Sequence, residues 1–172
     1  RLIRVRPSHI PPEKWQTPLR LNLLADASVP WATYAKLIVD TATAAGQRGG
    51  QAFFKESARD VMTHAMEALA VAGLDVTLSN VHDMICISTD LAMVLGRLAD
   101  RPGAAAETER QFFKDFASQP PEQKAGTVYS VANFLRPFTA PDIAEVFCSV
   151  EPNFSFSEVD QGRLICLSIP QT

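Results

Sequence analysis

The chain has 172 residues, of which 47% are hydrophobic and 20% are charged, and its formal net charge is −3. These values predict a soluble globular domain with a substantial hydrophobic core and exclude an intrinsically disordered chain. The acidic balance argues against non-specific nucleic-acid binding, because such proteins usually neutralise phosphates with an excess of basic residues.

No apolar run approaches the roughly 20 residues that span a bilayer, and no signal peptide begins the sequence. The first residues already have the pattern of a strand and include no initiator methionine. We therefore expect both ends to be cuts within a longer protein, and any membrane anchor to lie outside the 172 residues.

Residues 2–5 alternate apolar and basic side chains, a pattern that predicts a short strand. Residues 19–24 are apolar again and predict either a second short strand or a buried loop. Between these segments an extended loop is predicted, because it contains Pro7, Pro11, Pro12 and Pro18.

The first predicted helix follows Ser28, which we expect to be its N-cap, with Pro30 in the first turn. Three glycines, at positions 46, 49 and 50, are expected to end it. Its apolar side chains recur at spacings of three and four residues. They are Trp31, Tyr34, Ala35, Ile38, Val39 and Ala42.

The second predicted helix has the strongest amphipathic pattern of the chain. It ends at Gly73, the usual position of glycine just after a helix C-terminus. Its polar face carries charged residues such as Lys55 and Arg59. Its apolar face consists of Phe54, Ala58, Val61, Met62, Ala65, Leu69 and Ala72.

Two short helices are predicted next, over residues 81–85 and 91–98, each preceded by hydroxyl side chains that are suitable caps. The expected caps are Thr77 or Ser79 for the first helix and Ser88 or Thr89 for the second.

Three further helices complete the predicted helical region. Residues 107–116 bring Phe112, Phe113 and Phe116 onto a connected face, and residues 128–138 form another apolar stripe after Pro120 and Pro121. Residues 139–142 resemble a capping box for a last helix over residues 143–147.

Residues 163–169 form a continuous apolar run, which predicts a strand buried on both faces, as in a parallel sheet. We expect this strand to pair with residues 2–5 or to pack onto the helices. The three cysteines are too few and too widely spaced for a disulfide framework, so we expect buried reduced thiols. They are Cys86, Cys148 and Cys166.

The predicted fold is therefore mainly α, a bundle of about seven short helices with a small β remnant formed by the two chain ends. Residues 27–147 are expected to form the helical domain. Residues 1–26 and 148–172 are expected to supply the flanking strands and loops.

Four segments in this order resemble the TraG/TraD-type coupling proteins of conjugation and type IV secretion. They are LRLNLLA at 19–25, GQAFFKESARD at 50–60, SVANFLRPF at 130–138 continuing to Pro141, and GRLICLSIPQ at 162–171.

The resemblance implies a parent that is a hexameric, membrane-anchored ATPase at the cytoplasmic face of the bacterial inner membrane. Its RecA-like core would use ATP and magnesium, and the all-alpha domain inserted in that core would recognise substrates. The flanking strands of this chain would be fragments of the RecA-like sheet. The implied partners are a relaxase, an accessory relaxosome protein or a secreted effector.

Catalytic chemistry is not expected in this chain. The glycine-rich segment at 46–51 lacks the Lys-Ser or Lys-Thr of a phosphate-binding loop and follows a helix instead of a strand. We therefore predict no cofactor and no nucleotide turnover in the isolated chain. The histidines and cysteines have no closely paired, zinc-like spacing, so no metal site is predicted either, and His64 is expected at the edge of a buried helix face.

Candidate contact residues for a partner or DNA are basic or aromatic. Ordinary helix salt bridges and core packing are the competing explanations for them. The candidates are Lys55, Arg59, Lys114, Lys124, Arg136, Trp15 and Trp31.

Protein recognition during conjugative DNA transfer is the leading functional hypothesis. The alternative is a DNA-binding module of the same translocation motor. A third possibility is that the domain mediates contacts between ring subunits, although we expect the isolated chain to be monomeric.

Overall fold

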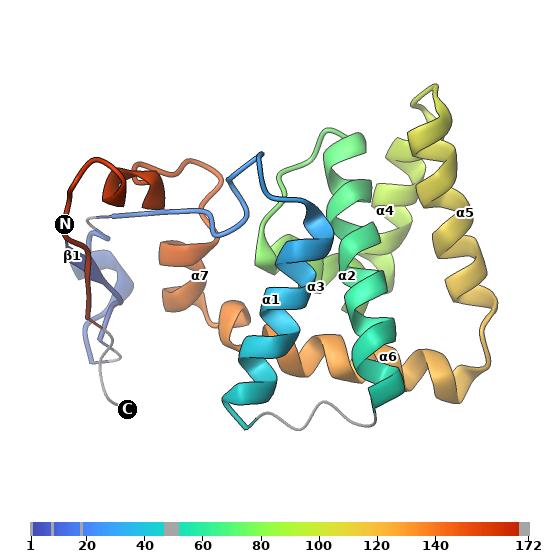
Figure 1. The fold of residues 1–172 in the computed structure, drawn as a ribbon, viewed down its shortest axis with the longest axis horizontal. Helices are drawn as coiled ribbons and strands as arrows, with labels where there is room; N and C mark the ends of the chain where they lie inside the picture. The colour runs from blue at the N-terminus through green and yellow to red at the C-terminus, as the bar shows by residue number, and fades with distance from the viewer. Residues whose placement is uncertain (1, 8, 18, 47–51, 169–172) are drawn as a thin grey trace.

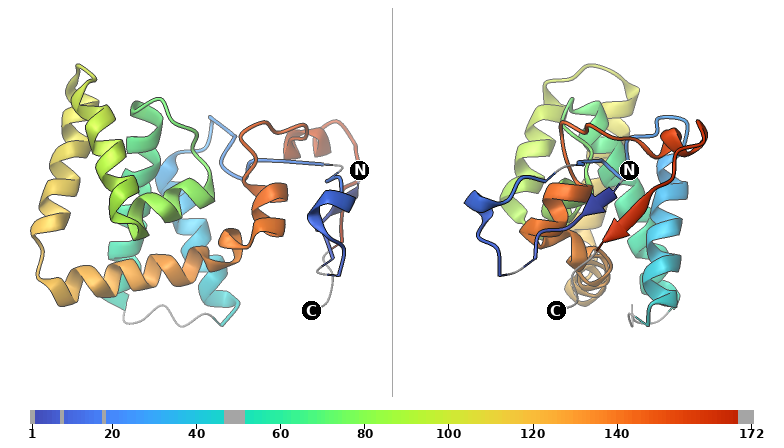
Figure 2. Two further views of the ribbon diagram at one scale, coloured as in Figure 1. Left: turned by 180° about the vertical axis from the view of Figure 1, so that it is seen from behind. Right: turned by 90° about the vertical axis from the view of Figure 1, so that its left-hand side faces the viewer.

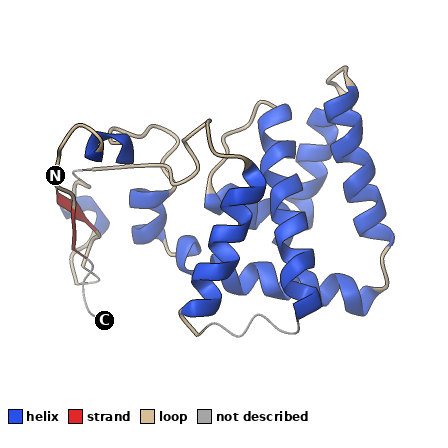
Figure 3. Cartoon of the chain, viewed as in Figure 1, coloured by secondary structure: helices blue, strands red, loops and turns tan. Residues whose placement is uncertain are grey.

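The computed structural model describes residues 2–7, 9–17, 19–46 and 52–168, and in these ranges the fold is mainly α, as predicted (Figure 3). Figures 1 and 2 show a bundle formed by the first six α-helices, with a smaller part beside it that contains both strands and the last α-helix. The α-helices are α1 (Trp31–Ala44), α2 (Ala52–Val71), α3 (Leu78–Cys86), α4 (Ser88–Ala99), α5 (Ala104–Ser118), α6 (Pro121–Leu135) and α7 (Pro141–Phe147). The remaining elements are β1 (Leu2–Arg4), η1 (Pro12–Lys14), η2 (Arg136–Thr139), η3 (Phe156–Val159) and β2 (Cys166–Ser168).

The central helix of the bundle is α2, which contacts α1, α3, α4, α5 and α6. Its small residues Ala58, Ala65 and Ala68 are completely buried, so neighbouring helices can approach its backbone closely. Larger side chains on the same helix, including Met62 and Met66, fill the remaining space in the core. The predicted apolar face of this helix is therefore confirmed as the centre of the main hydrophobic core.

Gly73 ends α2 as predicted, with a positive φ of 70°. The amide of Leu74 donates to the carbonyl of Leu69, and the amide of Gly73 donates to the carbonyl of Ala70. These two bonds form a Schellman motif, which satisfies carbonyls that the helix end would otherwise leave unpaired.

Replacing Gly73 by alanine is expected to lower the free energy of unfolding by about 1–2 kcal/mol, because a Cβ is unfavourable in the left-handed region. The new Cβ would also overlap with a guanidinium nitrogen of Arg101. The matched control is Gly96→Ala, in the exposed middle of α4 with open space around it, which should stabilise by about 0.5–1 kcal/mol. Urea unfolding of both variants measures the two effects, and equal effects would contradict this account.

One predicted helix cap is confirmed. Thr77 is the N-cap of α3, and its side chain accepts a hydrogen bond from the amide of Asn80. Ser79, the alternative cap, instead donates to the carbonyl of Phe138 and ties α3 to η2.

The other predicted caps are wrong. Pro30 is the N-cap of α1, while Ser28 bonds to the carboxylate of Asp26. Ile87 precedes α4 without a side-chain cap, so Ser88 and Thr89 already belong to the helix. No capping box starts α7, because Thr139 donates back to the carbonyl of Arg136. Hydroxyl groups such as those of Ser28 and Thr139 bond instead to a nearby carboxylate or backbone acceptor, which competes with the capping position.

The two strands pair in parallel, with Leu2 opposite Cys166 and Arg4 opposite Ser168. Of the two expected alternatives for the C-terminal strand, pairing with residues 2–5 is therefore confirmed. Of the two predicted alternatives for residues 19–24, a strand or a buried loop, the structure shows the loop. Leu21 and Leu24 are buried, and a single antiparallel β-bridge joins Asn22 to Cys148. A second small core joins these parts around Ile3, Val5, Leu21, Val146 and Phe154.

The prediction that the C-terminal strand is buried on both faces is wrong. All three residues of β2 are exposed, and 54% of Leu167 and 76% of Leu164 are accessible to solvent. Cys166 is exposed and Cys86 is half-buried, so only Cys148 is the buried thiol that was expected. A continuous apolar run predicts burial only when other elements cover both faces, and no described element covers β2. Ile169 lies outside the described residues.

Among the described residues, no helix combines the length and the apolar character that crossing a bilayer requires.

Candidate functional site

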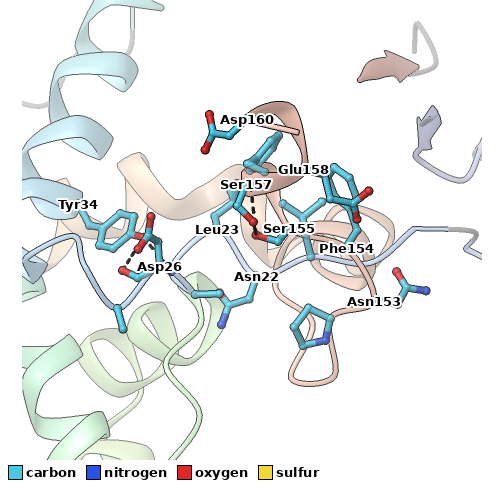
Figure 4. A pocket seen from close by; sticks show the side chains of 15 residues that line it. Asn22, Leu23, Asp26, Tyr34, Asn153, Phe154, Ser155, Ser157, Glu158 and Asp160 are labelled. Atoms are coloured by element: carbon cyan, nitrogen blue, oxygen red, sulfur yellow. Dashed lines mark hydrogen bonds between the residues drawn. The ribbon is translucent and has the colours of Figure 1, made fainter. Parts of the chain in front are cut away.

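A cleft of about 830 Å³ lies between the start of the helical bundle and the C-terminal segment. Figure 4 shows Asp26 and Tyr34 on one side of this cleft and residues 153–160 on the other. We call it the acidic cleft, because the charged residues among its described lining are Asp26, Glu158 and Asp160, and none of that described lining is basic.

The carboxylate of Asp26 accepts hydrogen bonds from both the hydroxyl and the amide of Ser28. These two bonds, the hydroxyl first, lower the pKa of Asp26, so the side chain stays ionised at neutral pH. Glu158 forms an ion pair with Arg163. Asp26 and Asp160 have no basic partner among the described residues, so the cleft keeps uncompensated negative charge.

Tyr34 forms one wall of the acidic cleft. Its hydroxyl donates to the carbonyl of Asp26 at 3.3 Å and accepts from the amide of the same residue at 3.2 Å. Burial raises the pKa of Tyr34, so the phenol remains neutral at physiological pH. The ring is therefore held in place at the N-terminal half of α1.

A second hollow of about 430 Å³ lies on the other side of Tyr34 and is almost entirely apolar. We call it the α1 groove. It includes Leu37, whose side chain is 55% exposed although it belongs to a helix of the bundle. The groove is lined by Leu23, Leu24, Tyr34, Leu37, Ile38, Thr41, Ala42, Ala45, Leu78, Phe134, Pro137 and Phe138.

The acidic cleft and the α1 groove share Leu23 and Tyr34 as lining residues, so the two hollows adjoin at these side chains. An apolar hollow next to an acidic one can hold a chain that carries both an apolar and a basic side chain. The sequence indicated neither hollow. The only local signal was Leu37, an apolar residue outside the buried stripe of its helix.

The most unusual buried polar contact joins α2 to α5. The Nδ1 atom of His64 lies 2.9 Å from a carboxyl oxygen of Glu109, which is only 4% exposed. Burial raises the pKa of Glu109, the hydrogen bond from His64 opposes this effect, and Glu67 adds to it. His64 also stacks on Phe112, with ring centroids 3.7 Å apart. Its half-buried position confirms the expected helix edge, whereas the sequence did not reveal its partner Glu109.

The predicted basic contact residues on α2 differ in their surroundings. Arg59 forms ion pairs with Asp40 of α1 and with Glu56 of its own helix, so its charge is already compensated. Lys55 is half-buried one turn earlier and has no ion pair among the described residues.

Two of the remaining predicted basic residues, Lys124 and Arg136, do not converge. Lys124 and Arg136 lie near opposite ends of α6, roughly 18 Å apart along the helix axis. The ammonium group of Lys124 lies 5.9 Å from the centre of the Phe116 ring, and Arg136 donates to Asn133. Lys114 is exposed on α5, in a hollow that Glu107 also lines. Lys124 and Arg136 are therefore too far apart to contact one short stretch of phosphate backbone together.

The two tryptophans are both half-buried and lie in different parts of the molecule. The guanidinium carbon of Arg4 lies 5.4 Å from the centre of the Trp15 ring. The buried Nε1 of Trp15 has no hydrogen-bond acceptor among the described residues. Trp31 begins α1 and packs against Tyr34 with ring centroids 6.0 Å apart. Trp31 thus adjoins a lining residue of both hollows, while Trp15 is associated with β1.

Groups for metal or nucleophilic chemistry are sparse in the described part of the chain. No three His, Cys, Asp or Glu side chains gather there in a way that could hold a metal ion. Burial and then the charge of Asp83 raise the pKa of Cys86 to about 11, so its thiol stays protonated and weakly nucleophilic at neutral pH. Residues 47–51, most of the glycine-rich segment considered above as a phosphate loop, lie outside the described residues.

Comparisons with known proteins add no identification. No protein-family model, no curated protein and no solved structure matches this chain.

Proposed function

We propose that this chain is the helical substrate-recognition domain of a type IV secretion coupling ATPase that takes part in conjugative DNA transfer. Residues 27–147 would recognise a relaxase, an accessory relaxosome protein or a secreted effector. Residues 1–26 and 148–172 would belong to the RecA-like core of a hexameric parent at the inner membrane, which would bind ATP and magnesium.

The parallel pairing of β1 with β2 carries this proposal. Parallel neighbours require a connection that crosses from the end of one strand to the start of the next. Here the entire helical bundle forms that connection. A helical domain inserted between adjacent strands of a parallel sheet would have this topology.

Exposed leucines in the C-terminal strand and just before it support the same proposal. Leu164 and Leu167 are both more than half exposed. A central strand of a RecA-like sheet would bury such residues against further strands and helices. The exposed surface of β2 is therefore where the rest of the ATPase core would pack.

Co-purification with the full-length parent tests the proposal. We expect relaxosome proteins to co-purify with the parent and to be lost when residues 27–147 are replaced by a flexible linker. Retained ATP hydrolysis by the deletion variant is the control for an intact ring. Equal recovery of the relaxosome proteins with and without the domain would contradict the proposal.

Direct DNA binding by the chain is the competing outcome. The separated and partly compensated basic residues lead us to expect no binding of single- or double-stranded oligonucleotides in fluorescence anisotropy. The titrations are compared at about 50 mM and about 200 mM salt, because phosphate contacts make affinity fall steeply with salt. Tight binding with a steep salt dependence would favour the DNA-binding alternative, and light scattering on the same samples would test the expected monomer.

A further inference from the structure

The surface around Tyr34 has an apolar hollow and an acidic hollow next to each other. The α1 groove offers apolar contacts from Leu37, Ile38 and Phe138, while the acidic cleft offers the carboxylates of Asp26 and Asp160. Tyr34 separates them, with its ring lining both hollows and its hydroxyl fixed by the backbone of Asp26.

The negative charge of the acidic cleft favours some binding partners over others. In the part of the chain that the structure describes, its lining has three carboxylates and no basic residue, and two of those carboxylates, Asp26 and Asp160, have no basic partner there. A phosphate backbone would be repelled by this charge. A second copy of the chain would bring a net charge of −3 of its own. A segment with lysine or arginine would be attracted, and its guanidinium or ammonium group could also face the Tyr34 ring.

The apolar groove adds the second requirement. A hollow of about 430 Å³ is large enough for one or two aliphatic or aromatic side chains, and its exposed edge at Leu37 keeps it open to solvent. Filling it would remove the exposed side chain of Leu37 from water, which is favourable in proportion to the apolar area covered.

We propose that the α1 groove and the acidic cleft together bind one segment of a partner polypeptide, in which a large apolar side chain is followed closely by lysine or arginine. The apolar side chain occupies the groove, and the basic side chain lies beside Asp26 and Asp160. This inference rests on the proposed recognition function and assigns it to the surface where the helical domain meets the flanking residues that supply Asp26 and Asp160.

Three labelled peptides of equal length are the probes for this proposal. The first alternates leucine pairs with lysine pairs, the second replaces the lysines by glutamate, and the third replaces the leucines by serine. We expect the 172-residue chain to bind the first peptide at least about tenfold more tightly than either of the others in fluorescence anisotropy. Raising the salt from about 50 mM to about 300 mM should weaken that binding, because the Debye length shortens.

Two variants locate the binding on the chain. Leu37→Ser removes the exposed edge of the groove and should weaken binding of the first peptide about three- to tenfold. The double variant D26N/D160N keeps side-chain shape, and the amide oxygen that it introduces at position 26 can still accept the bonds from Ser28. It should weaken binding by a similar factor and reduce its salt dependence, because two negative charges are removed from the cleft.

The matched controls change similar side chains elsewhere. Met93→Ser removes an exposed apolar side chain from α4, and the double variant E122Q/E145Q removes two exposed charges from α6 and α7. Neither control should alter peptide affinity. Equal binding of all three peptides, or equal affinity of groove variants and controls, would overturn the inference.

Sedimentation velocity tests whether a second copy of the chain occupies the groove. A dimer of the chain that Leu37→Ser dissociates would also overturn the inference, because the groove would then hold a second copy. If the peptides do not bind but relaxosome proteins still co-purify with the full-length parent, only the assignment of recognition to the groove and cleft is wrong. Failure of the co-purification would instead remove the proposed function itself.

Discussion

Replacing Phe113 by alanine is expected to lower the free energy of unfolding by about 3–5 kcal/mol, the usual cost of truncating a fully buried aromatic side chain. Phe113 is only 1% exposed, and it packs into the main core from α5. Its ring also contacts Phe112 edge-on, with centroids 5.2 Å apart. The truncation would leave a cavity where α5 packs into the bundle.

The matched control for this effect is Phe53→Ala on α2. Phe53 is 52% exposed, so the same chemical change should cost less than about 1 kcal/mol. Chemical denaturation with both variants at one pH measures the difference. Similar destabilisation by the two substitutions would mean that α5 does not pack against the bundle as described.

Replacing His64 by alanine is expected to destabilise the protein by about 1–3 kcal/mol at neutral pH, because it leaves the buried Glu109 carboxyl without its hydrogen-bond partner. The stacking contact with Phe112 would be lost as well. Glu109→Gln should cost less, since an amide can still form a hydrogen bond with the imidazole. Denaturation of both single variants and of the double variant would measure the part of the coupling energy that depends on the carboxyl group and that the amide does not preserve.

The same pair predicts how stability depends on pH. Because burial raises the pKa of Glu109, the folded protein holds this proton to higher pH than the unfolded chain does. The contribution of Glu109 is therefore fully present below the unfolded value of about 4.3 and is lost as pH rises through the raised native value. The test is to measure the free energy of unfolding of wild type and of Glu109→Gln at several pH values between these two pKa values. We expect the decline that comes from Glu109 in wild type and not in the glutamine variant. A decline of equal slope in the glutamine variant would assign it to other groups.

The helices were predictable because the information for them is local. In α2 the apolar residues recur with the period of the helix, and Gly73 has the conformational freedom that its positive φ requires. The caps were less predictable, since the hydroxyls of Ser28 and Thr139 donate to a nearby carboxylate or carbonyl and do not accept from the amides of the expected helix N-terminus. A hydroxyl group can satisfy several local motifs, and the sequence does not show which one the surrounding packing will favour.

The candidate surfaces were not predictable for a different reason. The groove depends on how α1 lies against α3 and η2, and the cleft depends on residues 152–160 lying across from Asp26. Arg59 was expected to contact a partner or its helical neighbours. Its pairing with Asp40 depends on the packing of α1 against α2.

The sequence by itself determined that this protein is a mainly helical domain with a strand pattern at each end, because hydrophobic periodicity and apolar runs act over short stretches of chain. Only the tertiary structure decided that β2 is uncovered, that Glu109 is buried against His64, and that an apolar groove adjoins an acidic cleft at Tyr34. These features depend on which elements become neighbours, and that choice is made by packing the whole chain around its core.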